Sequence, residues 1–251
     1  MIQKTKKDYL IEHKSWGNLK IIKIPGKSEK LAELVGIILG DGNIHVYQKS
    51  KKIAHYSLRI AGNYTKDYNY LVNFVARLCE ELFEVQPAIY KHCKFNGLYV
   101  TIRGRLITDF LLSIGLKPNN KIKSQVTIPD WIFEDETYLK ACIRGLIDTD
   151  GCIYELLPNW PGLFQLNFDN YNITLLKDAR KALIVLGYHP SKICGKKTIN
   201  GTAIYLTRKD EIKRFYKEIG SSNDRNIKQF TKLLKYTAPS SSGQISTQKG
   251  D

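Results

Sequence analysis

Apolar residues recur at helical spacing in several stretches of the chain, and strand-like alternation separates these stretches. Two apolar runs, LVGIILGDG at 34–42 and IRGLIDTDG at 143–151, each end in Asp-Gly. Downstream of each run, apolar side chains line one face of a predicted helix: Leu71, Phe74, Leu78 and Leu82 in the first case, and Leu175, Ala179, Ala182 and Leu186 in the second. This spacing is typical of amphipathic helices that lie on a sheet or on another helix.

The two runs begin two copies of one longer pattern. When Asp41 is aligned with Asp150, the matches that follow are Asn63-Tyr64 with Asn170-Tyr171, Pro87 with Pro190, Asn96-Gly97 with Asn200-Gly201, Gly115 with Gly220, and Ile122-Lys123 with Ile227-Lys228. The Asn-Gly pairs predict hairpin turns, and Gly115 and Gly220 suit the left-handed position just past a helix. A repeat of this length indicates two structural units of one kind.

Each unit reads helix, hairpin, helix, hairpin, helix, which predicts an α+β fold of two pseudo-symmetric αββαββα halves. We expect a first half at 31–128, a linker at 129–139 that contains Pro and an acidic run, and a second half at 140–236. Residues 1–30 form an N-terminal extension in which LKIIKI at 19–24 suits an edge strand. Residues 237–251 are rich in Ser and Gly, which is typical of a flexible tail.

Composition adds a partner to this picture. The 251 residues include 39 Lys and Arg against 24 Asp and Glu, so the formal charge is +15. Such a charge attracts polyanions, and nucleic acid is the leading candidate, although a basic protein can also be merely soluble. No apolar run approaches the roughly 20 residues of a membrane span. Five cysteines without C-x-x-C spacing predict reduced thiols rather than a zinc site or disulfides, and hence an intracellular protein.

Small residues lie one turn apart in each apolar run, at Gly36 and Gly40 and again at Gly145 and Thr149. A glycine inside a helix costs about 1 kcal/mol relative to alanine, so its presence indicates a close approach of two backbones. The natural partner of each small-residue stripe is the other stripe. We therefore expect the two helices to pack side by side across a pseudo-two-fold axis.

That packing brings Asp41 and Asp150 together at neighbouring carboxyl ends of helices. A carboxylate there is disfavoured by the helix dipole, and a second carboxylate nearby adds repulsion. A hard divalent cation with oxygen ligands would relieve both effects. We predict a site for Mg²⁺, or for Mn²⁺ or Ca²⁺, held by the two carboxylates and by helix-end carbonyls such as those of Gly40 and Thr149.

The two runs resemble the motif of the LAGLIDADG homing endonucleases, in the single-chain form that carries two motifs. IRGLIDTDG is a close match, whereas LVGIILGDG has Leu39 where the motif has its earlier Asp but keeps the last one. The resemblance covers about 31–236. It implies a site-specific endonuclease that cuts both strands of a long, asymmetric DNA target, with its sheets forming a DNA-binding saddle.

The resemblance also implies roles for individual residues. Asp41 and Asp150 would hold divalent metal near the two scissile phosphates, where the metal lowers the pKa of an attacking water. The family places a lysine near each site, and Lys123 and Lys228 occupy repeat-equivalent positions. Their neighbours Lys121 and Arg225 stay open as alternatives.

Alternation along the predicted strands selects the side chains that would face DNA. Aliphatic residues such as Ile44, Leu58 and Ile60 point to the core, so the intervening polar and aromatic residues point outward. This set comprises Asn43, His45, Tyr47, Lys49, His55, Ser57, Arg59, Tyr99, Thr101, Arg103, Tyr154, Gln165, Asn167 and Tyr205, with Lys51 and Lys52 at the first hairpin tip. Any half-solvated sheet shows such alternation, so the set as a whole supports DNA binding better than any single residue does.

Two other functions are compatible with this pattern. An RNA maturase of the same fold would bind intron RNA, and a DNA-binding regulator would retain the fold without cleavage. The presence of both aspartates favours a nuclease, because neither alternative needs paired carboxylates. An intein-embedded form is not expected, since the chain opens with Met and lacks splice-junction residues. We expect a monomer that acts on double-stranded DNA, in a prokaryotic cytoplasm or in an organelle.

Overall fold

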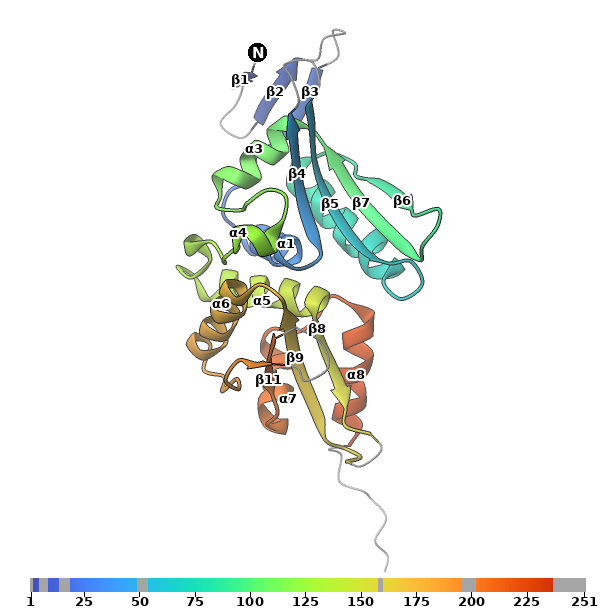
Figure 1. The fold of residues 1–251 in the computed structure, drawn as a ribbon, viewed down its shortest axis with the longest axis vertical. Helices are drawn as coiled ribbons and strands as arrows, with labels where there is room; N and C mark the ends of the chain where they lie inside the picture. The colour runs from blue at the N-terminus through green and yellow to red at the C-terminus, as the bar shows by residue number, and fades with distance from the viewer. Residues whose placement is uncertain are drawn as a thin grey trace, which may run out of the picture.

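The computed structural model describes residues 2–4, 9–13, 19–48, 54–157, 160–195 and 202–236. It has an α+β architecture in which two four-stranded antiparallel sheets flank a central pair of helices (Figure 1). The fold class predicted from the alternating patterns is confirmed. Among the described residues, no helix is both long and apolar enough to cross a membrane.

The first repeat begins with helix α1 (Glu29–Gly40) and strands β4 (Gly42–Gln48) and β5 (Ala54–Asn63). A π-helical turn η1 (Tyr70–Val75) then continues into α2 (Ala76–Phe83). Strands β6 (Ala88–Lys91) and β7 (Gly97–Arg103) and helix α3 (Arg105–Ser113) complete the unit. A one-turn helix α4 (Lys121–Ser124) and a 3-10 turn η2 (Asp130–Ile132) lead to the second repeat.

The second repeat has the same order: α5 (Glu136–Asp150), β8 (Gly151–Glu155), β9 (Phe164–Asn170), α6 (Ile173–Val185), β10 (Cys194–Gly195), β11 (Thr202–Leu206) and α7 (Lys209–Glu218). It ends in α8 (Asp224–Lys235), which is much longer than α4. The sheets run β4-β5-β7-β6 and β8-β9-β11-β10, so the two units share one topology.

Helices α1 and α5 begin at capping side chains, since Ser28 and Asp135 accept hydrogen bonds from backbone N–H groups of the first turns. The helix-ending glycines predicted from the sequence are confirmed. Gly115 and Gly220 follow α3 and α7 with φ of +103° and +74°. The hairpin predicted from Asn96-Gly97 joins β6 to β7, whereas Asn200-Gly201, Lys49, Lys51, Lys52 and the tail from 237 lie outside the described residues.

The N-terminal extension contains the expected strand, but that strand belongs to a sheet of its own. Strands β1 (Ile2–Lys4), β2 (Tyr9–His13) and β3 (Leu19–Lys23) pair as a three-stranded antiparallel sheet at one end of the molecule (Figure 1). Ile22 of β3 is fully buried, and Lys23 forms an ion pair with Glu84 just after α2 at 3.4 Å. The predicted linker is also packed, because Trp131 and Ile132 are buried.

Candidate functional site

The site is built on the contact between α1 and α5, which lie side by side at the centre of the molecule (Figure 1). A Cβ added to Gly36 would lie 2.1 Å from the backbone oxygen of Cys142, and one added to Gly145 would lie 2.4 Å from the backbone oxygen of Glu33. One added to Gly40 would lie in contact with the Thr149 side chain. The small residues therefore permit the close approach that the sequence predicts.

An ion pair crosses the same contact. The Arg144 guanidinium on α5 donates to both carboxylate oxygens of Glu33 on α1, at 2.8 and 2.5 Å. Ser222 also donates to Glu33 at 2.8 Å, and Arg144 donates to the Ile219 carbonyl at 3.1 Å. Glu33 is buried. This network fixes the axial position of α1 relative to α5, because sliding one helix along the other would leave the buried Glu33 carboxylate without a partner.

Both helices pass directly into strands, and this places the two aspartates. Asp41 is the C-cap residue between α1 and β4, and Asp150 is the last residue of α5 before β8. A Cβ at Gly42 would lie 2.4 Å from the Cα of Ile38, and one at Gly151 would lie 2.6 Å from the carbonyl oxygen of Ile147. These glycines are needed because the strand turns back tightly over the last helical turn.

Burial raises the pKa of both carboxylates, and the charge of Asp41 adds to the rise at Asp150. Partial burial, and next the charge of Asp41, raise the pKa of Asp150 to about 7. Desolvation raises the pKa of Asp41 to about 6, although this residue is exposed on one side, and the charge of Asp67 adds to the rise. Lys121 opposes both shifts. Among the described residues, no group of three or more His, Cys, Asp and Glu could hold a metal ion.

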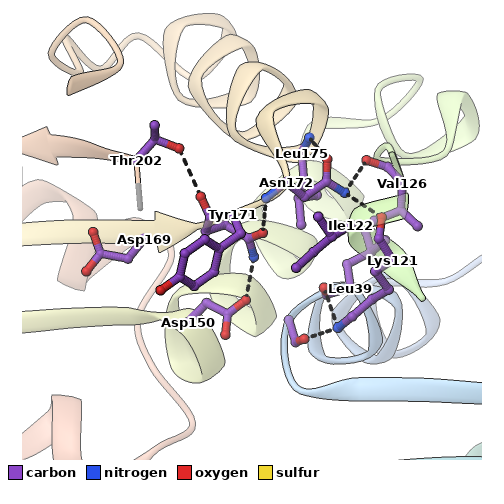
Figure 2. A pocket seen from close by; sticks show the side chains of 12 residues that line it. Leu39, Lys121, Ile122, Val126, Asp150, Asp169, Tyr171, Asn172, Leu175 and Thr202 are labelled. Atoms are coloured by element: carbon purple, nitrogen blue, oxygen red, sulfur yellow. Dashed lines mark hydrogen bonds between the residues drawn. The ribbon is translucent and has the colours of Figure 1, made fainter. Parts of the chain in front are cut away.

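Lys121 is the basic residue that the structure brings to the pair. Its ammonium donates to the carbonyls of Ile38 at 3.3 Å, Leu39 at 2.9 Å and Gly40, which are the last carbonyls of α1. Figure 2 shows Lys121 next to Leu39. Burial lowers the pKa of Lys121, while Asp150 and Asp41 oppose that change. The ammonium of Lys121 therefore already occupies the negative end of α1, and it binds the Gly40 carbonyl that the sequence predicts as a metal ligand.

The path of the chain after α3 explains this position. Asn119, with φ of +63°, donates its backbone N–H to the Ile44 carbonyl at 2.7 Å, and its side chain bonds to both backbone groups of Val46. The segment thus covers the free edge of β4 before α4 begins. Asn120 then caps α4 by accepting from the backbone N–H of Lys123. Lys121 is consequently aimed at α1, while Lys123 is exposed.

In the second repeat, other side chains bind the carbonyls near the end of α5. Asn226 donates to the Ile147 carbonyl at 3.3 Å, and Asn223 and Arg225 donate to the Asp148 carbonyl at 3.0 and 3.5 Å. Arg225 also pairs with Asp67 of the first repeat at 3.7 Å and lowers the pKa of Asp41. One lysine at α1 is therefore matched by an arginine and two asparagines at α5.

Asp148 has a role that the sequence did not reveal. It occupies the earlier acidic position of the second motif, where the first has Leu39, and it is buried. It accepts hydrogen bonds from the backbone N–H of Ser222 at 2.6 Å, from Asn226 at 3.1 Å and from the Ser221 hydroxyl. Burial raises its pKa to about 6. It anchors the segment that carries Arg225, so its function is positioning.

A pocket of about 290 Å³ opens beside Asp150 (Figure 2). Asn170, at the end of β9, donates to the Asp150 carboxylate at 2.7 Å and so fixes its orientation. Asp169 and Lys121 line the same space, and Leu39, Ile122, Val126 and Leu175 give it an apolar wall. The Asn-Tyr pair occurs in both repeats, at Asn63-Tyr64 and at Asn170-Tyr171, and this repetition could have singled out Asn170 as a site residue. It did not show that Asn170 contacts an aspartate.

The other predicted site residues fall into two groups. Lys123 and Lys228 are exposed, and neither is among the charges that chiefly shift the pKa of Asp41 or Asp150. The outward register of the strand residues is confirmed for Asn43, His45, Tyr47, His55 and Arg59, which are exposed, and for Ser57, Tyr99, Tyr154, Gln165 and Tyr205, which are half-buried; Arg103 is exposed as well. Asn43 already donates to the Asn119 carbonyl at 3.1 Å.

Thr101 and Asn167 depart from the expected exposure. They share the outer register, but their residues are only 3% and 7% exposed. Both lie on inner strands of their sheets, and their side-chain oxygens have no hydrogen-bond partner among the described residues. Strand alternation decides which face a side chain occupies, whereas the bulk of its neighbours decides whether solvent or DNA can reach it.

Comparisons with known proteins agree with this architecture. Residues 137–220 match the LAGLIDADG-like domain model. I-DmoI solved in complex with DNA and Mn aligns with a TM-score of 0.57 and 19% identity, over 77% of this chain and 97% of its own. The meganuclease I-SmaMI bound to uncleaveable DNA aligns with a TM-score of 0.56 and 10% identity, over 84% and 89% of the two chains. At these identities the structures establish the fold.

Curated relatives are larger proteins. The chain is 25% identical over 219 residues to the replication factor C small subunit of Methanocaldococcus jannaschii, covering 84% of this chain and 10% of the relative. It is 30% identical over 141 residues to the reverse gyrase of the same organism, covering 56% of this chain and 7% of the relative. The chain thus spans a tenth or less of the curated relatives that it matches.

Proposed function

We propose that the chain is a LAGLIDADG homing endonuclease, a site-specific enzyme that hydrolyses both strands of a long, asymmetric DNA target with a divalent cation. The match of residues 137–220 to the LAGLIDADG-like domain model and the fold shared with I-DmoI support this proposal. One observation carries the proposal. Asp41 and Asp150 come from different repeats, and the paired helices bring them close enough to raise the pKa of Asp150. Two carboxylates placed in this way suit two scissile phosphates, one in each strand.

The structures with this fold support the choice of substrate and cofactor. I-DmoI has been solved with DNA and Mn, with DNA and Ca and, as a variant, with target DNA and Mg. I-LtrWI, a LAGLIDADG homing endonuclease, has been solved bound to target DNA, and it aligns over 82% of this chain. By analogy, the half at 31–128 and the half at 140–236, joined by 129–139, would each engage one half of the target.

The donor set fits a hard divalent cation. Asp41 and Asp150 supply carboxylate oxygens, and the helix-end carbonyl of Thr149 supplies a neutral one, whereas the Gly40 carbonyl accepts a hydrogen bond from Lys121. Burial raises the pKa of both carboxylates, so their negative charges are poorly solvated there, and the ammonium of Lys121 lies at the same helix end. A bound cation would lower the pKa of an attacking water and stabilise the charge of the transition state.

The chain's own residues would position the metal ligands and neutralise phosphate charge. Asn170 holds the Asp150 carboxylate by a hydrogen bond of 2.7 Å, which fixes one ligand before DNA arrives. We assign to Lys121, and to Arg225 on the other side, the part that the sequence gave to Lys123 and Lys228. Each would offset phosphate charge, and the lowered pKa of Lys121 makes it the better proton donor of the two.

DNA would lie along the outer faces of the two sheets. Those faces carry exposed aromatic, amide and basic side chains on ribbons that fit the major groove. Binding of this kind releases counterions, so affinity should fall steeply with salt. A flat salt response would contradict DNA as the ligand.

The decisive experiment compares Asp41→Asn and Asp150→Asn with the parent on a randomised duplex library, in Mg²⁺ and in EDTA. We expect the parent to cut a defined site only in Mg²⁺, and each variant to bind that site but cleave it at least a hundredfold more slowly. Asp109→Asn is the matched control, because Asp109 is exposed on α3 and pairs with Arg105 at 3.1 Å. A D41N or D150N variant that cuts as fast as the parent would overturn the metal assignment.

A parent protein that binds DNA without cutting would instead support a DNA-binding regulator. Selective binding of intron RNA without cleavage would support the maturase alternative.

A further inference from the structure

The outer faces of the two sheets differ in charge. The first sheet presents Arg59 from β5 and Arg103 from β7, both exposed. The second sheet contains no Lys or Arg in the described residues of β8, β9, β10 and β11. Its outward positions carry neutral polar or aromatic groups and one acid: Cys152, Tyr154, Gln165, Asn167, Asp169 and Tyr205. The repeat has kept its backbone topology while its two reading faces have diverged.

Each arginine of the first sheet rests on a tyrosine. The guanidinium carbon of Arg59 lies 5.2 Å from the ring centre of Tyr99, and that of Arg103 lies 5.5 Å from the ring centre of Tyr90. These distances are typical of cation–π contacts. The aromatic platforms restrict side chains that would otherwise sample many rotamers, so less conformational entropy is lost when the arginines bind.

The strand register places the two arginines and the two tyrosines in one layer on the outer face of the first sheet. Thr101 lies opposite Arg59, and Tyr99 lies opposite Tyr90. Thr101, which lies between these side chains in the register, is only 3% exposed. The arginines are thus parts of a continuous layer above the sheet.

A planar guanidinium held at a fixed orientation above a ribbon suits the paired acceptors O6 and N7 of guanine in the major groove. Phosphate neutralisation alone would not need such orientation, because any mobile lysine supplies it. We propose that Arg59 and Arg103 read guanines in the half of the target that faces the first sheet, whereas the described outward strand positions of the second sheet offer neutral groups and one acid to the other half. This inference rests on the proposed function.

The second sheet shows the contrasting arrangement. The Tyr154 hydroxyl donates to the Gln165 side-chain oxygen across the strand pair at 2.5 Å. That bond leaves the Gln165 amide nitrogen as a donor on the outer face. A donor of this kind forms single hydrogen bonds with base acceptors and adds no positive charge. The two half-sites should therefore differ in base preference and in their contribution to the salt dependence of binding.

The test is a binding selection on a randomised duplex library in Ca²⁺, with the parent, Arg59→Lys and Arg103→Lys. These variants keep the charge but lose the planar fork. We expect each to lose, by roughly tenfold, the preference for guanine at one position of a single half-site, with the salt slope unchanged. Arg105→Lys is the matched control, since Arg105 lies on α3 and pairs with Asp109. Gln165→Ala should alter only positions in the opposite half.

The outcomes separate this inference from the proposed function. If the parent selects no sequence, the proposed function fails. If the parent selects a site and both lysine variants retain every base preference, the arginines neutralise phosphates and the inference is overturned. If the affected positions fall in both halves for one variant, the assignment of each sheet to one half-site is overturned as well. Thermal unfolding equal to that of the parent would establish that the variants are folded.

Discussion

Replacing Gly36 with alanine is the most direct test of the helix contact on which the site depends. The added Cβ would lie 2.1 Å from the backbone oxygen of Cys142. That oxygen would have to retreat by roughly 1.3 Å to reach van der Waals contact at about 3.4 Å. No rotamer change can supply this movement, because the obstructing atom belongs to the backbone of α5. The helices must separate.

Two energies of opposite sign decide the outcome. Alanine gains about 1 kcal/mol over glycine within a helix. Overpacking of a rigid core typically costs about 1–3 kcal/mol, and a backbone clash belongs at the upper end. We therefore expect Gly36→Ala to lose about 2 kcal/mol of unfolding free energy, which corresponds to a fall in Tm of about 4–8 °C for a chain of this size. Separation of the helices should also slow cleavage by about a hundredfold, because Asp41 moves away from Asp150.

Urea unfolding measures the first effect, and Gly26→Ala is the control, because its Cβ would meet nothing within 4 Å. Gly145→Ala should cost a similar amount, since its Cβ would lie 2.4 Å from the backbone oxygen of Glu33. The double variant should cost clearly less than the two separate losses together, because one separation relieves both clashes. A Gly36→Ala protein as stable as the parent and the Gly26→Ala control would refute this account of the helix contact.

Three further predictions follow from the same geometry. The pKa values of Asp41 and Asp150 are raised to about 6 and about 7, so the folded protein binds more protons than the unfolded chain between about pH 4 and 7, and these groups reduce stability as pH rises. Millimolar Ca²⁺ should therefore raise Tm at pH 8 and have little effect at pH 5. An equal effect at both pH values would contradict the two aspartates as ligands. Lys121→Met should slow cleavage about a hundredfold, and calorimetry should show tighter Ca²⁺ binding to the DNA-free protein, because a positive charge beside the carboxylates is lost. Lys123→Met should change neither quantity, since Lys123 is exposed. The reverse ranking would restore Lys123 as the functional residue. Arg144→Met should cost about 3–5 kcal/mol in urea unfolding because it strands a buried carboxylate, and a loss below about 1 kcal/mol would show that the inter-helix ion pair is dispensable.

Lys121 shows where sequence reasoning reaches its limit. The sequence repeat pairs Lys123 with Lys228. Which lysine reaches α1 depends on the orientation of a one-turn helix. Hydrogen bonds between Asn119 and the edge of β4 set that orientation, and they join residues more than seventy positions apart. A local pattern contains no information on such a contact.

The sequence by itself determined the order of elements, the face of each strand and the pairing of α1 with α5. These follow from periods of about 3.6 and 2 residues and from glycines in a helix, all of which act over a few neighbouring positions. The tertiary structure decided the burial of Thr101, the anchoring role of Asp148 and the exchange of one lysine for Arg225 and two asparagines at the second helix end. Each of these depends on groups distant in sequence meeting at contact distance, and side-chain volume and hydrogen-bond geometry there are set only once the two repeats have packed together.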